Sequence, residues 1–444
     1  MRRIVIVVFS SILFLLLISR LFFVIPFVPH LSYILGSEKP TTYILLLQND
    51  TELRANGGFA GSYAKMTFDS RPKNPNVILA KAGIYINKKP HVSVDFQDIY
   101  VPNGQLEGYV TPPLPIQEAF QHGTWELANA DWEPDFPTAA TSIRWFFEKG
   151  GEINPDILAT INLSTIKKIL EIIGPFPVRE YNAVITPQNL YAFLQSQAET
   201  DFFPGSTQKK DALTAVGLAF KNKLQSLNPI QYLKSARLLL YELNHGNLLL
   251  NSTNPDFQNF LEQKKWAGKL TPGSFDNYLL VETNLGANKA NCCIDRLTEH
   301  YISKETETYR HRIHLSLTNT SSGHNPNPPF DFSGNYIAYL RFYIPLDAWN
   351  IAVIPNPSTI SGTLSPTTII TPKYNLTEIG FFHTTSAGTT STVDLSYNLA
   401  TGSASHPYQL TLLKQNGLIS SPQNVIYQGR SKSTPLTDTT SISF

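Results

Sequence analysis

The hydrophobic pattern begins with a long apolar segment at the N-terminus. It runs from residue 4 to residue 18 and resumes at Leu21, with two arginines before it. This is the length of a bilayer-spanning helix, and positively charged flanks stay in the cytoplasm. A cleaved signal peptide is the alternative, but the run is longer than usual and no small-residue cleavage site follows. The pattern predicts a transmembrane anchor over residues 4–28, and hence a single-pass membrane protein with the bulk of the chain extracytoplasmic.

Strand and helix patterns then alternate. Residues 42–48 form a continuous apolar run, as in a strand buried on both faces. Apolar residues at 166, 169, 170 and 173 follow the helical repeat, behind Ser164 as the expected N-cap. Further helical stripes span residues 208–224 and 230–243. Together these elements predict a mixed α/β domain over residues 40–298.

Beyond residue 298 the hydrophobic pattern changes to a period of two residues. Apolar and polar residues alternate at 312–317 and again at 336–344, which is typical of strands with one buried face. The chain there is rich in Thr, Ser, Asn, Gly and Pro. We therefore expect a β-sandwich-like domain over residues 299–430 and a polar tail over 431–444.

Composition limits the classes of function. With 444 residues, of which 42% are hydrophobic and 16% charged, the chain can bury a sizeable core. A formal net charge of +1 offers no field for nucleic acid, so no nucleic-acid partner is expected. Cys292 and Cys293 are adjacent, and because a ring closed by neighbouring residues is strained and rare, we expect two packed thiols.

Candidate phosphate-binding residues follow the apolar run at 42–48. Arg54 is a cation, and Gly57 and Gly58 supply flexible backbone amides of the kind that approach phosphates closely. A structural turn in which glycine supplies a positive φ explains the same residues equally well. Asp50 and Glu52 are candidate ligands for a divalent cation there, or simply a solvated acidic pair.

Two acidic clusters lie further along. Asp98 closes an alternating run, and Asn129 and Asp135 lie in a short loop before a helix that starts at Pro137. Magnesium takes one or two carboxylates and leaves its other positions to water and phosphate. Capping of the helix by Asp135 is the alternative, and the two roles are compatible.

Lys209 and Lys210 stand at the start of the helix expected from residue 208. Cations there add to the positive end of the helix dipole, which costs stability unless an anion is bound. Two solvated surface lysines, screened by salt, are the alternative.

Several segments resemble a known bacterial family. Residues 49–62, 131–137, 173–175 and 288–291 carry motifs similar to those of the family called domain of unknown function 4012. The similarity extends over about residues 40–298. The activity of that family is not established, so the resemblance implies fold and location more than chemistry.

The order of elements is also distantly similar to the LytR-CpsA-Psr phosphotransferases, membrane-anchored enzymes that move glycopolymers from polyprenyl-phosphate lipids onto the cell wall. The parallel segments are 43–50, 93–102, 127–130, 173–178 and 208–211. Gln97 stands where that family has an arginine beside the equivalent of Asp98, and lysines replace its arginines near residue 209. Lysine holds a phosphate without the bidentate fork of arginine.

This likeness implies a fold class and a function. The fold is expected to be α/β: an N-terminal transmembrane helix, a LytR-CpsA-Psr-like domain and a β-sandwich-like domain. The function is cell-envelope assembly, in which a magnesium-dependent phosphotransferase moves a phosphoryl-linked glycopolymer from a polyprenyl pyrophosphate to the cell wall. The expected partners are the membrane, through the N-terminal helix, and a polyprenyl-linked glycan or cell-wall polymer.

The same likeness assigns roles to residues. Arg54 and Asp98 would be catalytic. The substrate would be bound by Arg54, Gly57, Gly58, Asn129, Lys209 and Lys210, and magnesium by Asp50, Asp98 and Asp135. The lipid would need an apolar channel, which Ile166, Ile169 and Ile173 could line, although core packing explains them as well.

A non-catalytic scaffold or adhesion protein with a degenerate transferase fold is the alternative function. Its sandwich would bind a glycan through Tyr336, Tyr339 and Tyr343, unless these tyrosines pack within the sheet.

Overall fold

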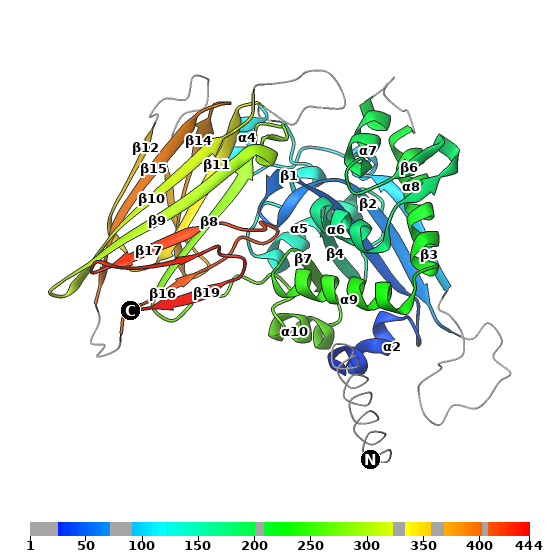
Figure 1. The fold of residues 1–444 in the computed structure, drawn as a ribbon, viewed down its shortest axis with the longest axis horizontal. Coiled ribbons are helices and arrows are strands. Elements are labelled where there is room, and N and C mark those ends of the chain that lie inside the picture. The colour runs from blue at the N-terminus through cyan, green and yellow to red at the C-terminus, as the bar shows by residue number, and fades with distance from the viewer. Residues whose placement is uncertain are drawn as a thin grey trace, which may run out of the picture.

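The computed structural model describes residues 25–71, 91–121, 123–199, 208–322, 334–356, 368–401 and 407–444. It contains an α/β unit and a β-sandwich that lie side by side (Figure 1). The mixed α/β character and the β-rich C-terminal part therefore agree with the predicted fold class, whereas its transmembrane helix does not.

In the described part of the chain, five strands form the sheet of the α/β unit in the order β3-β2-β1-β4-β7. The strands are β1 (Thr41–Arg54), β2 (Gly57–Asp69), β3 (His91–Asp98), β4 (Ile157–Asn162) and β7 (Leu248–Ser252). β1 pairs with β4 in parallel, and the other pairs are antiparallel. Every residue of β4 is buried because the strand lies between two neighbours with helices on both faces.

Helices cover both faces of this sheet. Alternate residues of β1 point to opposite sides, so Ile44 and Leu46 pack towards α5 (Phe136–Lys149), while Leu45 and Leu47 face the other helices. Those are α6 (Leu163–Ile173), α7 (Leu190–Glu199), α8 (Gln208–Gln225) and α9 (Pro229–Asn244), and α10 (Pro255–Gln263) packs beside β7. The shorter elements are α2 (Leu31–Ile34), α3 (Tyr100–Asn103), α4 (Leu114–Ala119), η2 (Leu127–Asn129), η3 (Arg179–Tyr181), η4 (Ala290–Cys293), β5 (Phe176–Val178) and β6 (Ala183–Ile185).

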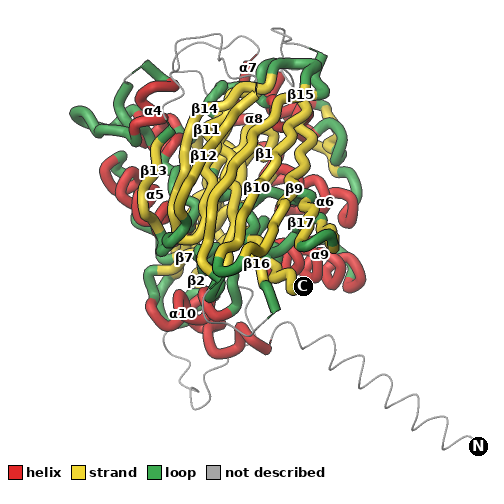
Figure 2. The backbone as a smooth tube through the Cα atoms, turned by 90° about the vertical axis from the view of Figure 1, so that its left-hand side faces the viewer, coloured by secondary structure: helices red, strands yellow, loops and turns green. Residues whose placement is uncertain are grey.

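The described strands of the C-terminal part form two sheets of six strands each (Figure 2). The outer sheet has the order β12 (Trp349–Asn356), β15 (Thr390–Ala400), β10 (Thr308–Asn319), β9 (Ile294–Glu305), β17 (Gln423–Tyr427) and β18 (Arg430–Thr434). The inner sheet has the order β13 (Ile369–Lys373), β14 (Leu376–Thr385), β11 (Tyr336–Pro345), β8 (Asp276–Asn284), β16 (Gln409–Leu412) and β19 (Thr440–Ser443).

The limits of the sandwich differ from the sequence-based division. β8, which starts at Asp276, already pairs with β11, and the predicted boundary at residues 298/299 falls inside β9. The segment 431–444, expected to be a frayed tail, contains β19 and most of β18, both paired. Parallel pairing of β16 with β8 and of β17 with β9 joins these late strands to the two sheets.

The sandwich core confirms the period-two pattern. Ile313, Leu315 and Leu317 of β10 are buried between the sheets. Tyr336 and Tyr343 are fully buried and Tyr339 is 3% exposed. These tyrosines therefore pack within the protein, in agreement with the sheet-packing explanation and not with a binding surface.

The structure contradicts the predicted transmembrane anchor and, with it, the single-pass localisation. Among the described residues, no helix has both the length and the apolar character needed to cross a membrane. Residues 25–28, the end of the predicted span, lie in the 3-10 helix η1 (Ile25–His30), where Phe27 stacks on Trp266 of the α/β unit with ring centroids 5.0 Å apart. The rest of the predicted span, residues 4–24, lies outside the described residues.

A second correction concerns the cysteines. The sulfur atoms of Cys292 and Cys293 form a disulfide between neighbouring residues at the end of η4, so the expectation of two thiols is wrong. Asn291, directly before them, accepts a hydrogen bond from the backbone N–H of Leu53 at 2.9 Å. The turn with the disulfide is therefore tied to the end of β1.

Buried hydrogen bonds join the two units. The side-chain amide of Gln415, in the segment after β16, donates to the backbone oxygens of Arg54 and Glu282, each at 2.9 Å. The next residue, Asn416, donates to the side chain of Asn56 and to the backbone oxygen of Gly268. Because these groups are buried and would lack partners if the units separated, the sandwich supports the end of the β1–β2 hairpin.

The sandwich core should make stability depend on pH through His300. Burial lowers the pKa of His300 to about 4 from its ordinary 6.5. Between pH 6.5 and 4 the unfolded chain binds more protons than the folded one, so the free energy of unfolding falls as the pH falls, by about 3 kcal/mol from this residue. Urea unfolding between pH 6.5 and 4 should show that the free energy of unfolding falls more steeply in the wild type than in His300→Phe. Equal slopes in the two proteins would contradict the role of His300.

Candidate functional site

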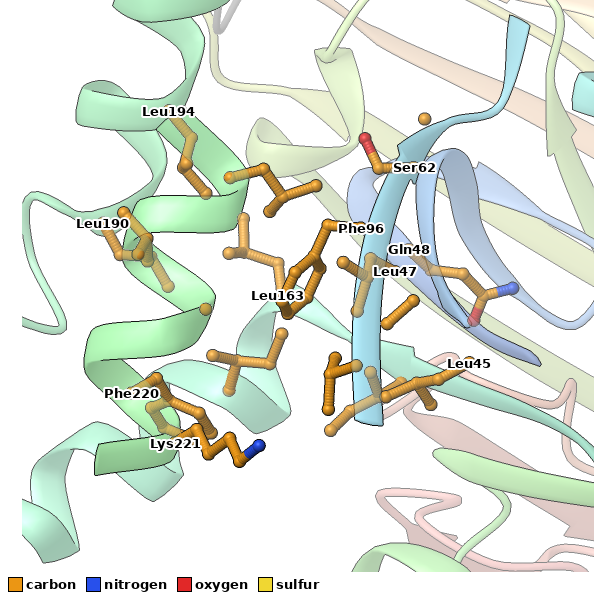
Figure 3. A pocket seen from close by; sticks show the side chains of 18 of the residues that line it. Leu45, Leu47, Gln48, Ser62, Phe96, Leu163, Leu190, Leu194, Phe220 and Lys221 are labelled. Carbon is orange, nitrogen blue, oxygen red and sulfur yellow. The ribbon is translucent and has the colours of Figure 1, made fainter. Parts of the chain in front are cut away.

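A cavity of 1110 Å³ lies between the sheet of the α/β unit and the helices on one of its faces (Figure 3). This exceeds the roughly 300–1,000 Å³ of common small-molecule pockets. Strands β1, β2 and β3 form one wall, and α6, α7 and α8 form the other. The apolar lining includes Leu45, Leu47, Ala64, Met66, Val92, Val94, Phe96, Leu163, Ile166, Ile169, Leu170, Phe176, Leu190, Leu194, Leu213, Val216, Leu218, Phe220 and Leu224.

The cavity follows the length of β3 and α8. Lys209 at the start of α8 meets Asp98 at the end of β3, and Lys221, further along the helix, donates to the backbone oxygen of Val92 near the start of β3. Twelve residues of helix separate the two lysines, which corresponds to about 18 Å. The space is therefore elongated and suits a long apolar chain.

Polar side chains gather at the Asp98 end. The Nζ atom of Lys209 lies 2.8 Å from a carboxylate oxygen of Asp98 and donates to the backbone oxygen of Gly61 at 2.8 Å. Glu52 and Lys289 also line this part of the cavity. We call these four charged residues, Glu52, Asp98, Lys209 and Lys289, the cavity mouth. It carries two acidic and two basic side chains, so it is polar but close to neutral.

Arg54 is placed behind the mouth. Its guanidinium donates to the backbone oxygen of Asn284 at 2.7 Å and to Glu52 at 3.0 Å, and it lies 5.1 Å from the centre of the Phe59 ring. It also donates to the side-chain oxygen of Asn129 at 3.3 Å, which brings together two predicted substrate-binding residues. Only 3% of Arg54 is exposed. Its buried contacts join the β1–β2 hairpin to the sandwich.

The predicted glycine loop is a tight β-hairpin. β1 continues to Arg54, β2 begins at Gly57, and the register between them shifts at two places. Gly57 has a φ of +124°, and a side chain on Gly58 would come within 2.0 Å of the Asn49 backbone. The structural explanation of these glycines, a turn that only glycine can form, therefore accounts for both of them.

The three carboxylates predicted to bind magnesium have separate partners. Asp50 accepts a hydrogen bond from Ser164, and burial raises the pKa of Asp50. Ser164 is not the predicted N-cap of α6, because the helix begins at Leu163 and its N-cap position is Asn162. Asp98 pairs with Lys209. Asp135 caps α5 by accepting from the backbone N–H of Thr138 at 3.1 Å, as the capping interpretation predicted.

The three carboxylates do not form a single metal-binding cluster. No group of three or more His, Cys, Asp or Glu side chains in the described part of the chain could hold a metal. Magnesium stays a prediction, and no step of the chemistry below depends on it.

Sequence reasoning missed Lys289 at the cavity mouth. Lys210, next to Lys209, does not line the cavity, whereas Glu52 and Lys289 do. Lys289 comes from the segment between β8 and η4, more than two hundred residues from Glu52, so no local pattern links them. Of the isoleucines expected to line a channel, Ile166 and Ile169 do so, and Ile173 packs in the adjoining core.

A buried polar network supports the wall behind the mouth. Gln48, which lines the cavity, donates to Asp131 at 3.3 Å, and Asn56 donates to the other oxygen of Asp131 at 2.7 Å. Burial raises the pKa of Asp131 to about 6. The side-chain oxygen of Gln48 is buried beside Gly57 and has no hydrogen-bond partner among the described residues.

Comparison with known proteins confirms the predicted family resemblance. The model of the family described as "Protein of unknown function (DUF4012)" matches residues 88–198, from the start of β3 into α7. A search of curated proteins found no match to the chain.

Several solved structures are similar at low identity. They include the Lin1025 protein from Listeria innocua (12% identity, 52% of this chain and 80% of that chain, TM-score 0.27) and TagV from B. subtilis (12%, 55% and 87%, 0.29). A Legionella pneumophila protein described as nutrient-binding matches at 8% identity over 35% of this chain and 55% of its own, with a TM-score of 0.24. Because these TM-scores are below 0.5, no conclusion about the site rests on them.

Proposed function

We propose that this protein binds a polyprenyl pyrophosphate-linked glycan and acts in bacterial cell-envelope assembly. The observation that carries the proposal is the elongated 1110 Å³ cavity, whose lining is mainly apolar between the four charged residues of the mouth and Lys221 at the opposite end. Burial of an apolar chain there would contribute about 25 cal/mol for each Å² removed from water. The resemblance to the LytR-CpsA-Psr enzymes supports the choice of an isoprenoid lipid among apolar chains.

The head group would lie at the cavity mouth. Lys209 and Lys289 supply positive charge for the phosphates. On binding, Lys209 would exchange part of its ion pair with Asp98 for a phosphate oxygen. This exchange is inexpensive because the Lys209 side chain is 32% exposed and the ion pair is screened by water.

Transfer of the glycan is the finer part of the proposal. An acceptor hydroxyl would attack the glycan-bearing phosphorus, the bond from that phosphorus to the bridging oxygen would break, and polyprenyl phosphate would leave. Asp98 is the carboxylate at the mouth that can accept the proton of the hydroxyl. The phosphoryl group would thus pass from the lipid to the acceptor with the lysines compensating the charge of the leaving group.

A non-catalytic lipid-binding scaffold is the second candidate. The balance of Glu52 and Asp98 against Lys209 and Lys289 favours it, since catalysts of phosphoryl transfer concentrate positive charge at the phosphates. Release of polyprenyl phosphate from the bound lipid, measured with a cell-wall glycan acceptor, would distinguish the two candidates.

Lys209→Gln should weaken binding of polyprenyl pyrophosphate about tenfold and leave binding of the uncharged polyprenol unchanged. A hydrogen bond to a charged group is worth about 1.5 kcal/mol or more, and glutamine removes the charge while keeping a donor. Fluorescence titration of the full chain with both lipids measures the difference. Lys210→Gln is the control, and equal losses in both variants would contradict a head group at Lys209.

A further inference from the structure

A second cavity lies on the sandwich, away from the α/β unit. It has a volume of 530 Å³ and lies on the outer sheet, where β9, β10 and β15 run side by side (Figure 2). We call it the sandwich groove. Its lining comes from those three strands, from β12 and from the turn that follows β17.

Strand alternation determines which side chains face the groove. On β10, Arg310 and Arg312 point outward with 63% of each side chain exposed, while His311 between them is buried. The register places Arg312 between Tyr301 and Ser396 on the neighbouring strands, and Arg310 between Ser303 and Asn398. Two rows of side chains thus cross the three strands, each with an arginine at its centre.

The charged side chains that line the sandwich groove are both basic, and each has an acidic partner at the edge of the groove. Arg310 and Arg312 are the charged side chains among its described lining residues, because burial lowers the pKa of His311 to about 3 and keeps that ring neutral. Their acidic partners, Glu305 at 2.9 Å and Asp394 at 3.1 Å, do not line the groove. Such exposed ion pairs contribute little, so an anionic ligand can replace them.

The remaining lining residues suit a ligand rich in hydroxyl groups. Tyr301 is 39% exposed and offers a ring face, with the Arg312 guanidinium 5.9 Å from its centre. The neutral hydrogen-bonding side chains are Ser303, Asn350, Ser396, Asn398 and Gln428. Planar amides, hydroxyls and an aromatic ring match the hydroxyls and the apolar faces of sugar rings, while arginine forks match carboxylates.

We propose that the sandwich groove binds an acidic polysaccharide, with its carboxylates on Arg310 and Arg312 and a sugar ring against Tyr301. The whole chain has a net charge of +1 and the groove has two cations beside five neutral hydrogen-bonding groups, which favours a glycan over nucleic acid. The proposal does not depend on what the cavity of the α/β unit binds.

Calorimetric titration of the full chain with oligogalacturonate, a carboxylated glycan, tests the proposal. Saturable binding is expected, with a loss of at least tenfold in Arg310→Gln/Arg312→Gln and in Tyr301→Ala. Arg430→Gln, on β18 of the same sheet but outside the groove, should bind as the wild type does. Because Arg310, Arg312 and Tyr301 are exposed, thermal unfolding should be unchanged, which separates lost binding from lost folding.

Two comparison ligands define the class. A neutral galacto-oligosaccharide should bind at least tenfold more weakly than oligogalacturonate, and polyglutamate, which has carboxylates but no sugar, should also bind more weakly. No saturable binding by the wild type, an equal loss in Arg430→Gln, or equal binding of polyglutamate would each overturn the proposal.

Discussion

Replacing Leu213 with tryptophan should reduce the affinity for a polyprenyl lipid about a hundredfold. Leu213 lies on α8, lines the cavity and is only half-buried, so a larger ring can extend into the open space. If the ring displaces roughly 110 Å² of apolar ligand surface, the loss at about 25 cal/mol per Å² is about 2.7 kcal/mol, which corresponds to a hundredfold change. Fluorescence titration with a labelled polyprenyl pyrophosphate measures it.

The control for this variant is Asn222→Trp, which adds the same ring to an exposed position of α8 outside the cavity. It should bind as the wild type does. Filling the cavity should keep or raise the melting temperature of Leu213→Trp, because it adds contacts without removing a partner. Unchanged affinity in a folded Leu213→Trp protein would show that the lipid does not occupy this cavity.

Arg54→Ala should lower the free energy of unfolding by about 3–5 kcal/mol. The variant leaves the buried backbone oxygen of Asn284 without its donor and removes the positive partner of Glu52, whose side chain is 12% exposed. Breaking a buried charged contact costs that much because the remaining groups cannot reach water. Urea unfolding of the full chain measures the change.

Arg71→Ala is the matched control for Arg54→Ala. Arg71 pairs with Asp69 at 2.9 Å, but their side chains are 48% and 32% exposed, so its loss should leave the free energy of unfolding close to that of the wild type. If Arg54→Ala instead kept its stability and lost only lipid binding, Arg54 would be a ligand of the phosphates, as the family resemblance implies, and its structural assignment would be wrong.

The regular elements could be predicted because their patterns are local. The apolar residues 166, 169, 170 and 173 lie on α6, and the stripe starting at residue 208 lies on α8. The alternation around Ile313 marks β10, whose alternate residues face the core. In each case the period of the element appears directly in a few consecutive residues.

The hairpin could not be predicted in this way. Residues 49–52 are polar and interrupt the apolar run, which suggests a loop, yet β1 continues through them because β2 pairs with it across a register shift. Pairing between strands overrides local polarity there. A short run of polar residues within an apolar strand pattern is as typical of a β-bulge as of a loop.

The cavity could be predicted only in part. An apolar helical stripe has the same sequence pattern whether it packs against a core or lines an open space, so Ile169 and Ile173 cannot be distinguished before the structure is known. The cavity mouth includes Lys289, which lies just before η4. This part of the chain contacts β1 although the two are far apart in the sequence. Such long-range contacts leave no trace in a single sequence.

The central claim is that the elongated cavity binds a long isoprenoid chain, and the dependence of affinity on chain length tests it most directly. Full-length protein would be titrated with a long-chain polyprenyl pyrophosphate and with geranyl pyrophosphate, which has the same head group on a short chain. If the apolar cavity binds the lipid, the long chain should bind at least a hundredfold more tightly. Equal affinities for the two lipids, or binding of neither, would contradict the claim.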